Sequence, residues 1–334
     1  MPDYPRRELL KRAAALGVGA MASTSRAFAG ASPGSGEGAQ SSSSTPDFFP
    51  GFKRDAVKTT GASIHYVTAG SGPPLLLLHG YPQTHIEWRE VAAPLAKKFT
   101  VVAADLRGYG DSSKPADGEN HLGYSKRAMA QDQVEMMASL GFQKFAVVGH
   151  DRGGRVAHRM ALDHPDRVTK LAILDIVPTY KVLHSVTNDL ATVNFHWWFL
   201  IQKEPLPETL IGNSAEFWLQ SRFSRIPPGV LSKEAFAEYL RCFQLPGSIH
   251  GSCEDYRAGA TIDLIHDAAD LDHKISCAVL VLWAERGAWP KLFDVLQVWR
   301  ERATTVTGRE IPSGHFIAEE KPEMLLEELN KFFS

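Results

Sequence analysis

The sequence has few of the features that would indicate a metal centre, a disulfide framework or a nucleic-acid interface. Its 334 residues include three cysteines, an odd number that cannot pair completely within the chain. It contains no His-x-x-x-His and no Cys-x-x-Cys spacing, so no pattern supports a metal site. Basic and acidic residues nearly balance, 36 against 38, and no basic block indicates nucleic-acid binding. We therefore expect no metal, no cofactor and no nucleic-acid partner.

The chain also has little that could span a membrane. The apolar stretch at 13–22 is short and rich in alanine and glycine. It follows Arg6-Arg7 and precedes Ala27-Phe28-Ala29, which is the order of elements in a twin-arginine export signal with an A-x-A cleavage site. Three elements in the right order favour this interpretation over a chance extension. We interpret residues 1–29 as a signal peptide, and we expect a periplasmic or secreted protein without a stable membrane span in its mature form.

The rest of the chain alternates short apolar runs with helical stretches, after a Gly/Ser-rich segment at 30–46 that is typical of a flexible linker. Four of the runs lie at 75–78, 101–104, 145–148 and 171–174. Helical stretches separate or follow them at 90–97, 126–140 and 156–163. Apolar strands alternating with helices predict an α/β fold with a mostly parallel, doubly wound sheet.

The alternation stops after Pro178 and resumes with an apolar run at 278–283. The intervening residues are rich in aromatic side chains and lack clear strand patterns. We therefore predict an α/β core formed by residues 47–178 and 267–334, with a mostly helical cap at 179–266 inserted late in the sheet.

The most distinctive segment is a tight turn between an apolar run and a helical stretch. Residues 149–155 read Gly-His-Asp-Arg-Gly-Gly-Arg, and small residues at a strand–turn–helix junction are typical of a nucleophile elbow. Most elbows carry serine at the centre, whereas this one carries Asp151. An aspartate could be structural here, and similar turns occur in nucleotide-binding sheets.

Two other segments favour a catalytic elbow. The loop at 78–82 follows a predicted strand and is of the kind that supplies a backbone N–H to an oxyanion hole. His315 lies near the C-terminus in Ser-Gly-His-Phe, after the last strand-like segment. A nucleophile, then an acid, then a late histidine is the order found in α/β-hydrolases.

These segments resemble the haloacetate dehalogenase family, in particular the fluoroacetate dehalogenases. The resemblance extends from Phe49 to the C-terminus and covers both core and cap. Its matching segments are 79–83, 105–110, 149–155 with 158–165, 174–179, 196–197, 255–258 and 313–316. The sequence departs from the family in its export signal and at 217–234, where members often carry a Gly-Trp wall.

The resemblance implies an α/β-hydrolase fold and an aspartyl-ester mechanism. Asp151 would attack the halogen-bearing carbon and form an ester, which water can open at its own carbonyl and so regenerate the nucleophile. His315 would be the general base for that water. Asp175 would orient His315. Glu285, after the next strand, is the alternative acid.

Backbone and side-chain groups near the elbow complete the implied site. The backbone N–H groups of Tyr81 and Arg152 would form the oxyanion hole. The side chains of Arg152 and Arg155 would bind the substrate carboxylate, because guanidinium groups suit two-pronged binding of carboxylates. One arginine alone would more often face a structural acid. Two arginines beside an unusual nucleophile favour carboxylate recognition.

The resemblance also places the halide-binding site in the cap, at His196, Trp197 and Tyr256. Imidazole, indole and phenol groups supply the donors that a departing fluoride needs. The surrounding sequence, Phe-His-Trp-Trp-Phe, is apolar enough for these side chains to pack as cap core instead. The further match around Tyr256 favours the halide site.

Three functions compete at this point. The first is dehalogenation of fluoroacetate or chloroacetate, with a small haloacid as the only expected partner besides a second copy of the chain in a homodimer. The second is epoxide hydrolysis by the same aspartate, histidine and acid, with Tyr239 or Tyr256 activating the epoxide oxygen. The paired arginines argue against it. The third is a ligand-binding protein without activity, against which the intact catalytic residues argue.

Overall fold

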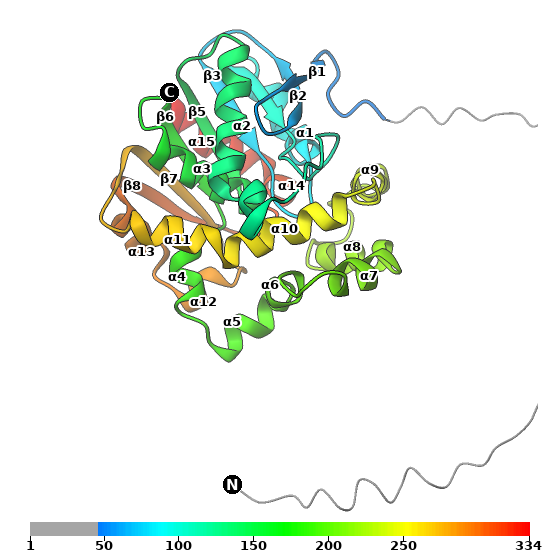
Figure 1. Ribbon diagram of the computed structural model, residues 1–334. Coiled ribbons are helices and arrows are strands. Elements are labelled where there is room, and N and C mark those ends of the chain that lie inside the picture. Colours follow the sequence, from blue (N-terminus) through cyan, green and yellow to red (C-terminus); the bar gives the residue numbers. More distant parts are fainter. Residues whose placement is uncertain (1–45) are drawn as a thin grey trace, which may run out of the picture. The chain divides into compact units, whose positions relative to one another are not determined.

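The computed structural model describes residues 46–334 (Figure 1). The predicted signal peptide at 1–29 and the linker up to residue 45 lie outside the described residues. Among the helices of the described part, none combines the length and the apolar character needed to cross a membrane.

The core is an eight-stranded sheet with the order β1-β2-β4-β3-β5-β6-β7-β8. The strands are β1 Lys53–Lys58, β2 Ser63–Ala69, β3 Pro74–Leu78, β4 Thr100–Ala104, β5 Phe145–His150, β6 Val168–Leu174, β7 Ile275–Ala284 and β8 Ala303–Ile311. The β1–β2 and β2–β4 pairs are antiparallel, and all the others are parallel. The predicted mostly parallel α/β sheet is confirmed.

Helices cover both faces of this sheet. On one face α2 (Lys126–Ser139) packs against α3 (Asp151–Asp163), and α1 (Arg89–Leu95) and α15 (Pro322–Phe333) pack together on the other (Figure 1). The remaining core helices are η1 His85–Trp88, η2 Glu119–Tyr124, α12 Trp289–Leu292, α13 Val295–Arg302 and α14 Ile317–Glu320. The central strands are buried on both faces, which explains their continuous apolar sequences.

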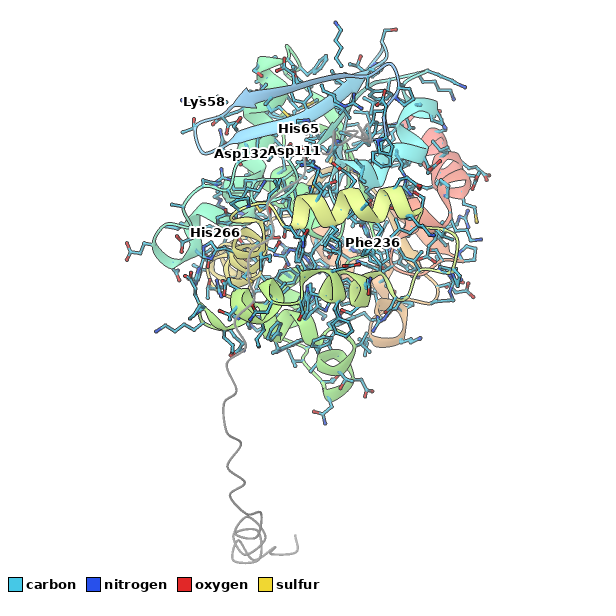
Figure 2. The ribbon with its side chains drawn as sticks, turned by 90° about the vertical axis from the view of Figure 1, so that its right-hand side faces the viewer. Lys58, His65, Asp111, Asp132, Phe236 and His266 are labelled. Carbon is cyan, nitrogen blue, oxygen red and sulfur yellow. The ribbon has the colours of Figure 1, made fainter. Side chains whose placement is uncertain are left out.

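The chain leaves the core after β6 and returns to it at β7. The intervening cap helices are α4 Thr179–Leu183, α5 Asn188–Val193, α6 Phe195–Leu200, α7 Leu206–Gly212, α8 Ala215–Phe223, α9 Lys233–Phe243, α10 Ser248–Ala260 and α11 Ile262–Ala269. Figure 1 shows α4 to α8 in the lower part of the view, below the sheet, and the β1–β2 pair at the top. Figure 2 labels Phe236 on α9 and His65 on β2.

The turn from β5 into α3 is tight enough to require glycine. A Cβ at Gly149 would lie 2.5 Å from the carbonyl oxygen of Gly153, and a Cβ at Gly153 would lie 2.3 Å from that of Leu78. Asp151 itself has a φ of 42°, in the left-handed region that non-glycine residues rarely adopt. The helix therefore begins at Asp151, five residues before the stretch at 156–163 that the sequence pattern indicated.

Candidate active site

The candidate catalytic side chains all lie at one edge of the sheet. Asp151 and Asp175 directly follow β5 and β6, and His315 lies in the loop after β8. Because β5 to β8 are parallel, their carboxyl ends meet at the same edge. Ligands of α/β sheets bind at that edge. The topology therefore brings together three residues that are far apart in the sequence.

His315 lies between the two aspartates. Its Nδ1 is 2.6 Å from Asp175 Oδ2, and its Nε2 is 4.0 Å from Asp151 Oδ2. The second oxygen of Asp175 accepts a hydrogen bond of 2.9 Å from the backbone N–H of Ala284. Glu285 is exposed and makes no ion pair with His315. The acid that contacts the histidine is thus Asp175.

Asp151 is buried at 6% exposure, and its environment favours the charged form. Burial by itself raises the pKa of this carboxyl, but the nearby imidazole of His315 and the positive charges of His150, Arg155 and Arg152 outweigh burial and leave its pKa below the usual value. The backbone N–H of Tyr81 donates to Asp151 Oδ2 over 3.1 Å. The nucleophile is therefore an ionised carboxylate at neutral pH.

His150 supplies one of these charges. Although burial opposes its protonation, Glu87, whose Oε1 lies 2.8 Å from His150 Nδ1, raises the pKa of His150 to about 9. Its Nε2 donates to the backbone carbonyl of His315 over 2.9 Å, so a charged imidazole supports the catalytic histidine. The local sequence gave no signal of the charge on His150, because Glu87 lies on η1, which follows a different strand.

The predicted oxyanion donors lie on either side of Asp151. Tyr81 follows β3, and Gly80 beside it approaches so closely that a Cβ there would be 2.8 Å from Asp151 Cβ. Arg152 occupies the first turn of α3, where backbone N–H groups have no partner within the helix. Both N–H groups thus belong to segments that border the nucleophile.

The two predicted substrate arginines have different surroundings. The carboxylate of Asp255 pairs with Arg152 and accepts hydrogen bonds from its Nε and Nη2 over 2.7 Å each. The Arg152 guanidinium also lies 4.1 Å from the ring centre of Tyr256. Arg155 Nη1 donates to Val177 and Thr179, but its Nε and Nη2 have no hydrogen-bond partner within 46–334. Arg152 thus pairs with a structural acid along its Nε–Nη2 edge, whereas Arg155 does not.

Arg155 is a buried cation without a carboxylate partner. Burial and the neighbouring charge of Arg152 lower the pKa of Arg155 to about 10, so it stays protonated at neutral pH. Its guanidinium lies 4.6 Å from the ring centre of Trp197. Buried donors without partners are costly in folded proteins and are commonly satisfied by a ligand. Of the two arginines, Arg155 offers more free donors to a substrate carboxylate.

The three predicted halide residues lie together in the cap. The ring centres of His196 and Trp197 are 5.9 Å and 6.2 Å from that of Tyr256. His196 Nδ1 and Tyr256 Oη are buried and have no hydrogen-bond partner among the described residues. Burial, together with Arg222, lowers the pKa of His196, so its imidazole is neutral and carries one N–H. These unsatisfied groups fit a small anion.

A cavity of about 480 Å³ connects the catalytic residues to the cap. Its lining includes Asp151, Asp175, His315, Tyr81, His196 and Trp197, together with Arg222, Arg225 and Arg286. Sequence reasoning missed these three arginines. Tyr239, one of the two tyrosines considered for epoxide opening, donates to Glu319 over 2.6 Å. Tyr239, Tyr256, Arg152 and Arg155 are not among the residues that line this cavity.

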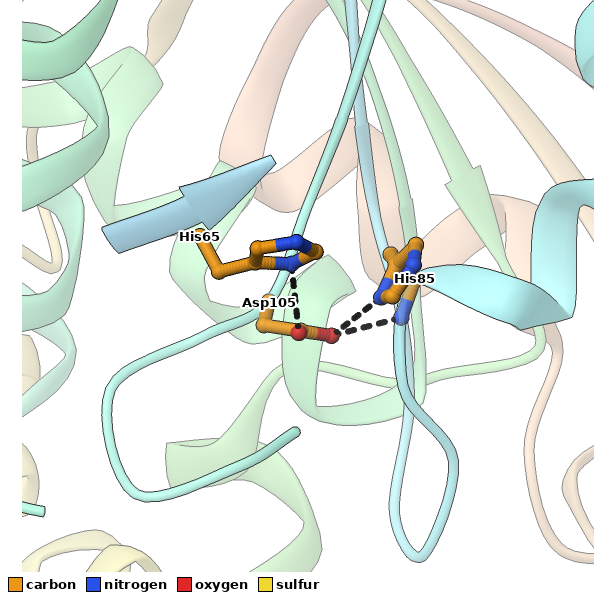
Figure 3. A group of neighbouring side chains, drawn as sticks. All are labelled: His65, His85 and Asp105. Carbon is orange, nitrogen blue, oxygen red and sulfur yellow. Dashed lines mark hydrogen bonds and ion pairs between the residues drawn. The ribbon is translucent and has the colours of Figure 1, made fainter. Parts of the chain in front are cut away.

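A second cluster brings together His65, His85 and Asp105, which are residue types that can bind metals (Figure 3). Asp105 Oδ1 accepts from the backbone N–H and Nδ1 of His85 over 2.8 and 2.9 Å. Its Oδ2 accepts from His65 Nδ1 over 3.1 Å and from the backbone N–H of Asp111 over 2.9 Å. Each carboxylate oxygen of Asp105 thus already accepts two hydrogen bonds. The cluster is a hydrogen-bond network that connects β2 and η1 to the end of β4.

The ion pair of His150 with Glu87 predicts a pH-dependent stability. The folded-state pKa of His150 is raised from 6.5 to about 9, so its stabilising contribution is complete below pH 6.5 and is lost as pH rises through about 9. Glu87→Gln keeps an acceptor for the Gly80 N–H but removes the charge. Urea unfolding across this range should show a steeper loss of stability in the wild type than in Glu87→Gln.

The matched control is Glu90→Gln, since the Glu90 side chain is 56% exposed and pairs only with Arg89 among the described residues. It should follow the wild-type profile. Equal pH slopes for the wild type and Glu87→Gln would show that His150 is not charged in the folded protein.

The chain matches the family model described as alpha/beta hydrolase fold over residues 73–322. It is 45% identical to a fluoroacetate dehalogenase from a Burkholderia species, over 86% of this chain and 95% of that protein. It is 40% identical to a soluble epoxide hydrolase from a Corynebacterium species, over 82% of this chain and 94% of that protein.

A solved structure of an alpha/beta hydrolase from Nostoc sp PCC 7120 superposes with a TM-score of 0.84 at 55% identity, over 85% of this chain and 98% of that one. The family match and these relatives agree with the hydrolase-type arrangement of residues at the carboxyl edge of the sheet. The chain belongs to the α/β-hydrolase family.

Proposed function

We propose that this hydrolase removes halogen from short haloacids, converting fluoroacetate or chloroacetate to glycolate and halide. The observation that carries the proposal is the arrangement around Asp151. An ionised carboxylate lies next to His315 and Asp175, while buried donors of Arg155, His196 and Tyr256 lack partners nearby. Those donors match a substrate with a carboxylate at one end and a halogen at the other.

The first step forms an ester. One carboxylate oxygen of Asp151 attacks the carbon that carries the halogen, and the carbon–halogen bond breaks as the halide leaves with the electron pair. Arg155 binds the substrate carboxylate, and Arg152 contributes through Nη1, because Asp255 occupies its Nε and Nη2. The positive charges of these two arginines hold the anionic substrate next to the anionic Asp151 despite the repulsion between the two carboxylates.

The departing halide needs donors because it leaves carbon as a full anion beside the buried side chains of Trp197 and Tyr256. The N–H of the neutral His196, the O–H of Tyr256 and the indole N–H of Trp197 are the groups assigned to it. The unsatisfied His196 Nδ1 and Tyr256 Oη support this assignment. Donors aimed at developing charge lower the barrier most in a dry site.

The second step opens the ester. His315 Nε2 takes a proton from water, and the resulting hydroxide adds to the ester carbonyl carbon of Asp151. The 4.0 Å between His315 Nε2 and Asp151 Oδ2 suits a histidine that acts on water rather than on the carboxylate itself. The N–H groups of Tyr81 and Arg152 stabilise the oxyanion, and Asp175 stabilises the imidazolium. Collapse breaks the bond to the glycolate oxygen, which takes the proton held by His315, and Asp151 returns to its carboxylate with release of a proton to water.

Epoxide hydrolysis is the second candidate, since one relative is a soluble epoxide hydrolase and Tyr256 Oη has no acceptor in the described structure. Tyr256 would donate its proton to the epoxide oxygen while Asp151 attacks carbon. The buried Arg155 disfavours a neutral epoxide, because its guanidinium group would have no carboxylate partner in the complex. We also propose that residues 1–29 are an export signal, so that hydrolysis takes place in the periplasm or outside the cell.

A substrate panel tests the proposal. The purified protein is incubated with fluoroacetate, chloroacetate and a styrene-type epoxide, and halide and diol are measured. Halide release from at least one haloacid is expected, with little diol, because only the acids carry the carboxylate that Arg155 can pair. Diol formation without halide from either acid would establish the epoxide hydrolase instead.

The choice of acid predicts a difference between Asp175→Asn and Glu285→Gln. Asparagine cannot stabilise the imidazolium of His315, so we expect ester hydrolysis to slow by about 10³- to 10⁴-fold. The initial burst of halide, which needs only Asp151, should remain. Glu285→Gln is the matched control and should keep both phases. A larger loss of ester hydrolysis in Glu285→Gln would overturn the assignment.

A further inference from the structure

The cavity is larger than a haloacetate requires. Its volume of about 480 Å³ lies within the range of roughly 300–1,000 Å³ that is typical of sites for drug-sized ligands. A haloacetate has only two carbon atoms, and the groups assigned to it cluster around Asp151. The rest of the cavity extends along cap helices α5 and α8, where Val193, Ser221 and Ser224 line it. This part of the cavity has no role in the reaction proposed above.

A cation on the cap faces this additional space. Arg222 lies in the last turn of α8 and lines the cavity. Its guanidinium lies 4.8 Å from the ring centre of Phe195 and 5.0 Å from that of Trp218, so two aromatic rings hold it in place. Its one hydrogen bond to another described residue goes from Nε to Ser221 Oγ over 3.3 Å.

Arg222 has no acidic partner in the described part of the chain. It forms no ion pair there, whereas Arg286 at the same cavity pairs with Glu320 over 2.9 Å. Burial lowers the pKa of Arg222, which reflects a half-buried charge without a carboxylate to compensate it. Arg225, the next cation along the chain, lines the same cavity and is exposed. The cap side of the cavity therefore carries positive charge that remains available to a ligand.

Arg155 and Arg222, two cations without an acidic partner within residues 46–334, belong to different parts of the molecule. Arg155 lies on core helix α3, has buried free donors and packs against the ring of Trp197, which lines the cavity, whereas Arg222 lies on cap helix α8 (Figure 1). Asp151 is the nucleophile of the cavity that Arg222 lines. A substrate with one carboxylate satisfies one of these cations. A substrate with a carboxylate at each end satisfies both.

We propose that Arg222 determines specificity by binding a second carboxylate, so that the preferred substrates are halogenated dicarboxylic acids with halogen on the carbon next to one carboxylate. This rests on the proposed function. Arg155 binds the carboxylate next to the halogen, and Arg222 binds the distal one. Asp151 displaces halide from the halogen-bearing carbon, water opens the ester at the Asp151 carbonyl, and the hydroxy diacid is released with a proton.

The test compares 2-chlorosuccinate with 2-chlorobutyrate, which has a methyl group where the former has its distal carboxylate. Chloroacetate serves as the reference. In the wild type, kcat/KM should be higher for chlorosuccinate than for chlorobutyrate. In Arg222→Gln, kcat/KM for chlorosuccinate should fall by about 10- to 150-fold, the factor expected for losing hydrogen bonds to a charged group. The values for chlorobutyrate and chloroacetate should change by less than about threefold.

Two variants control this comparison. Arg222→Lys keeps the charge and should retain part of the preference. Arg241→Gln removes a positive charge from cap helix α9, where Arg241 pairs with Asp111 and Glu238 outside the cavity, and should leave the preference unchanged. Equal losses for chlorosuccinate and chloroacetate in Arg222→Gln would mean that Arg222 binds the carboxylate next to the halogen. No preference in the wild type would also overturn the proposal.

Failure of the proposed function gives a different result. In that case no halide is released from any of the three acids. Calorimetry then tests the second site without turnover, by comparing binding of succinate and butyrate to the wild type and Arg222→Gln. Tighter binding of succinate that Arg222→Gln abolishes supports the dicarboxylate site, and equal binding of the two acids contradicts it.

Discussion

The site depends on keeping a buried carboxylate ionised. Burial favours the neutral form of Asp151, and a neutral carboxyl group is a poor nucleophile. The structure offsets this cost with the positive charges of His150, Arg152 and Arg155, and with the backbone N–H of Tyr81. The same charges attract an anionic substrate. One electrostatic arrangement therefore activates the nucleophile and selects the class of ligand.

Each of these charges needs support of its own. Glu87 keeps His150 protonated, and Asp255 compensates Arg152 while it also contacts Lys126 and accepts from Tyr109 over 2.6 Å. Arg155 lacks such a partner. Of these three cations, only Arg155, where a substrate carboxylate is proposed to bind, has no acidic partner. This arrangement is consistent with a site that is stabilised by binding an anionic ligand.

Much of the core was predictable from the sequence because its strands are buried on both faces and read as apolar runs. The first two strands were not, since β1 is largely exposed and its sequence, Lys-Arg-Asp-Ala-Val-Lys, has no apolar run. The elbow and His315 were visible as local patterns. The partner of Arg152 was not, because Asp255 lies on a cap helix and only the fold brings the two together.

Other parts of the site also depend on contacts between distant segments. His65, His85 and Asp105 have no metal-like spacing in the sequence, yet they form one hydrogen-bonded cluster. Arg222 lies in the segment that departs from the resembled family, so no pattern pointed to it. Its position follows from α8 and from the rings of Phe195 and Trp218. Local sequence thus revealed the chemistry of the nucleophile, and tertiary structure revealed which cations remain free.

The most direct measurement of the central claim is the intact mass of His315→Asn after incubation with chloroacetate, followed by peptide mapping. If Asp151 attacks carbon and His315 is needed only to open the ester, the variant should release one halide per site and carry a carboxymethyl group on Asp151. Unmodified protein, or modification at another residue with Asp151 unchanged, would contradict the account.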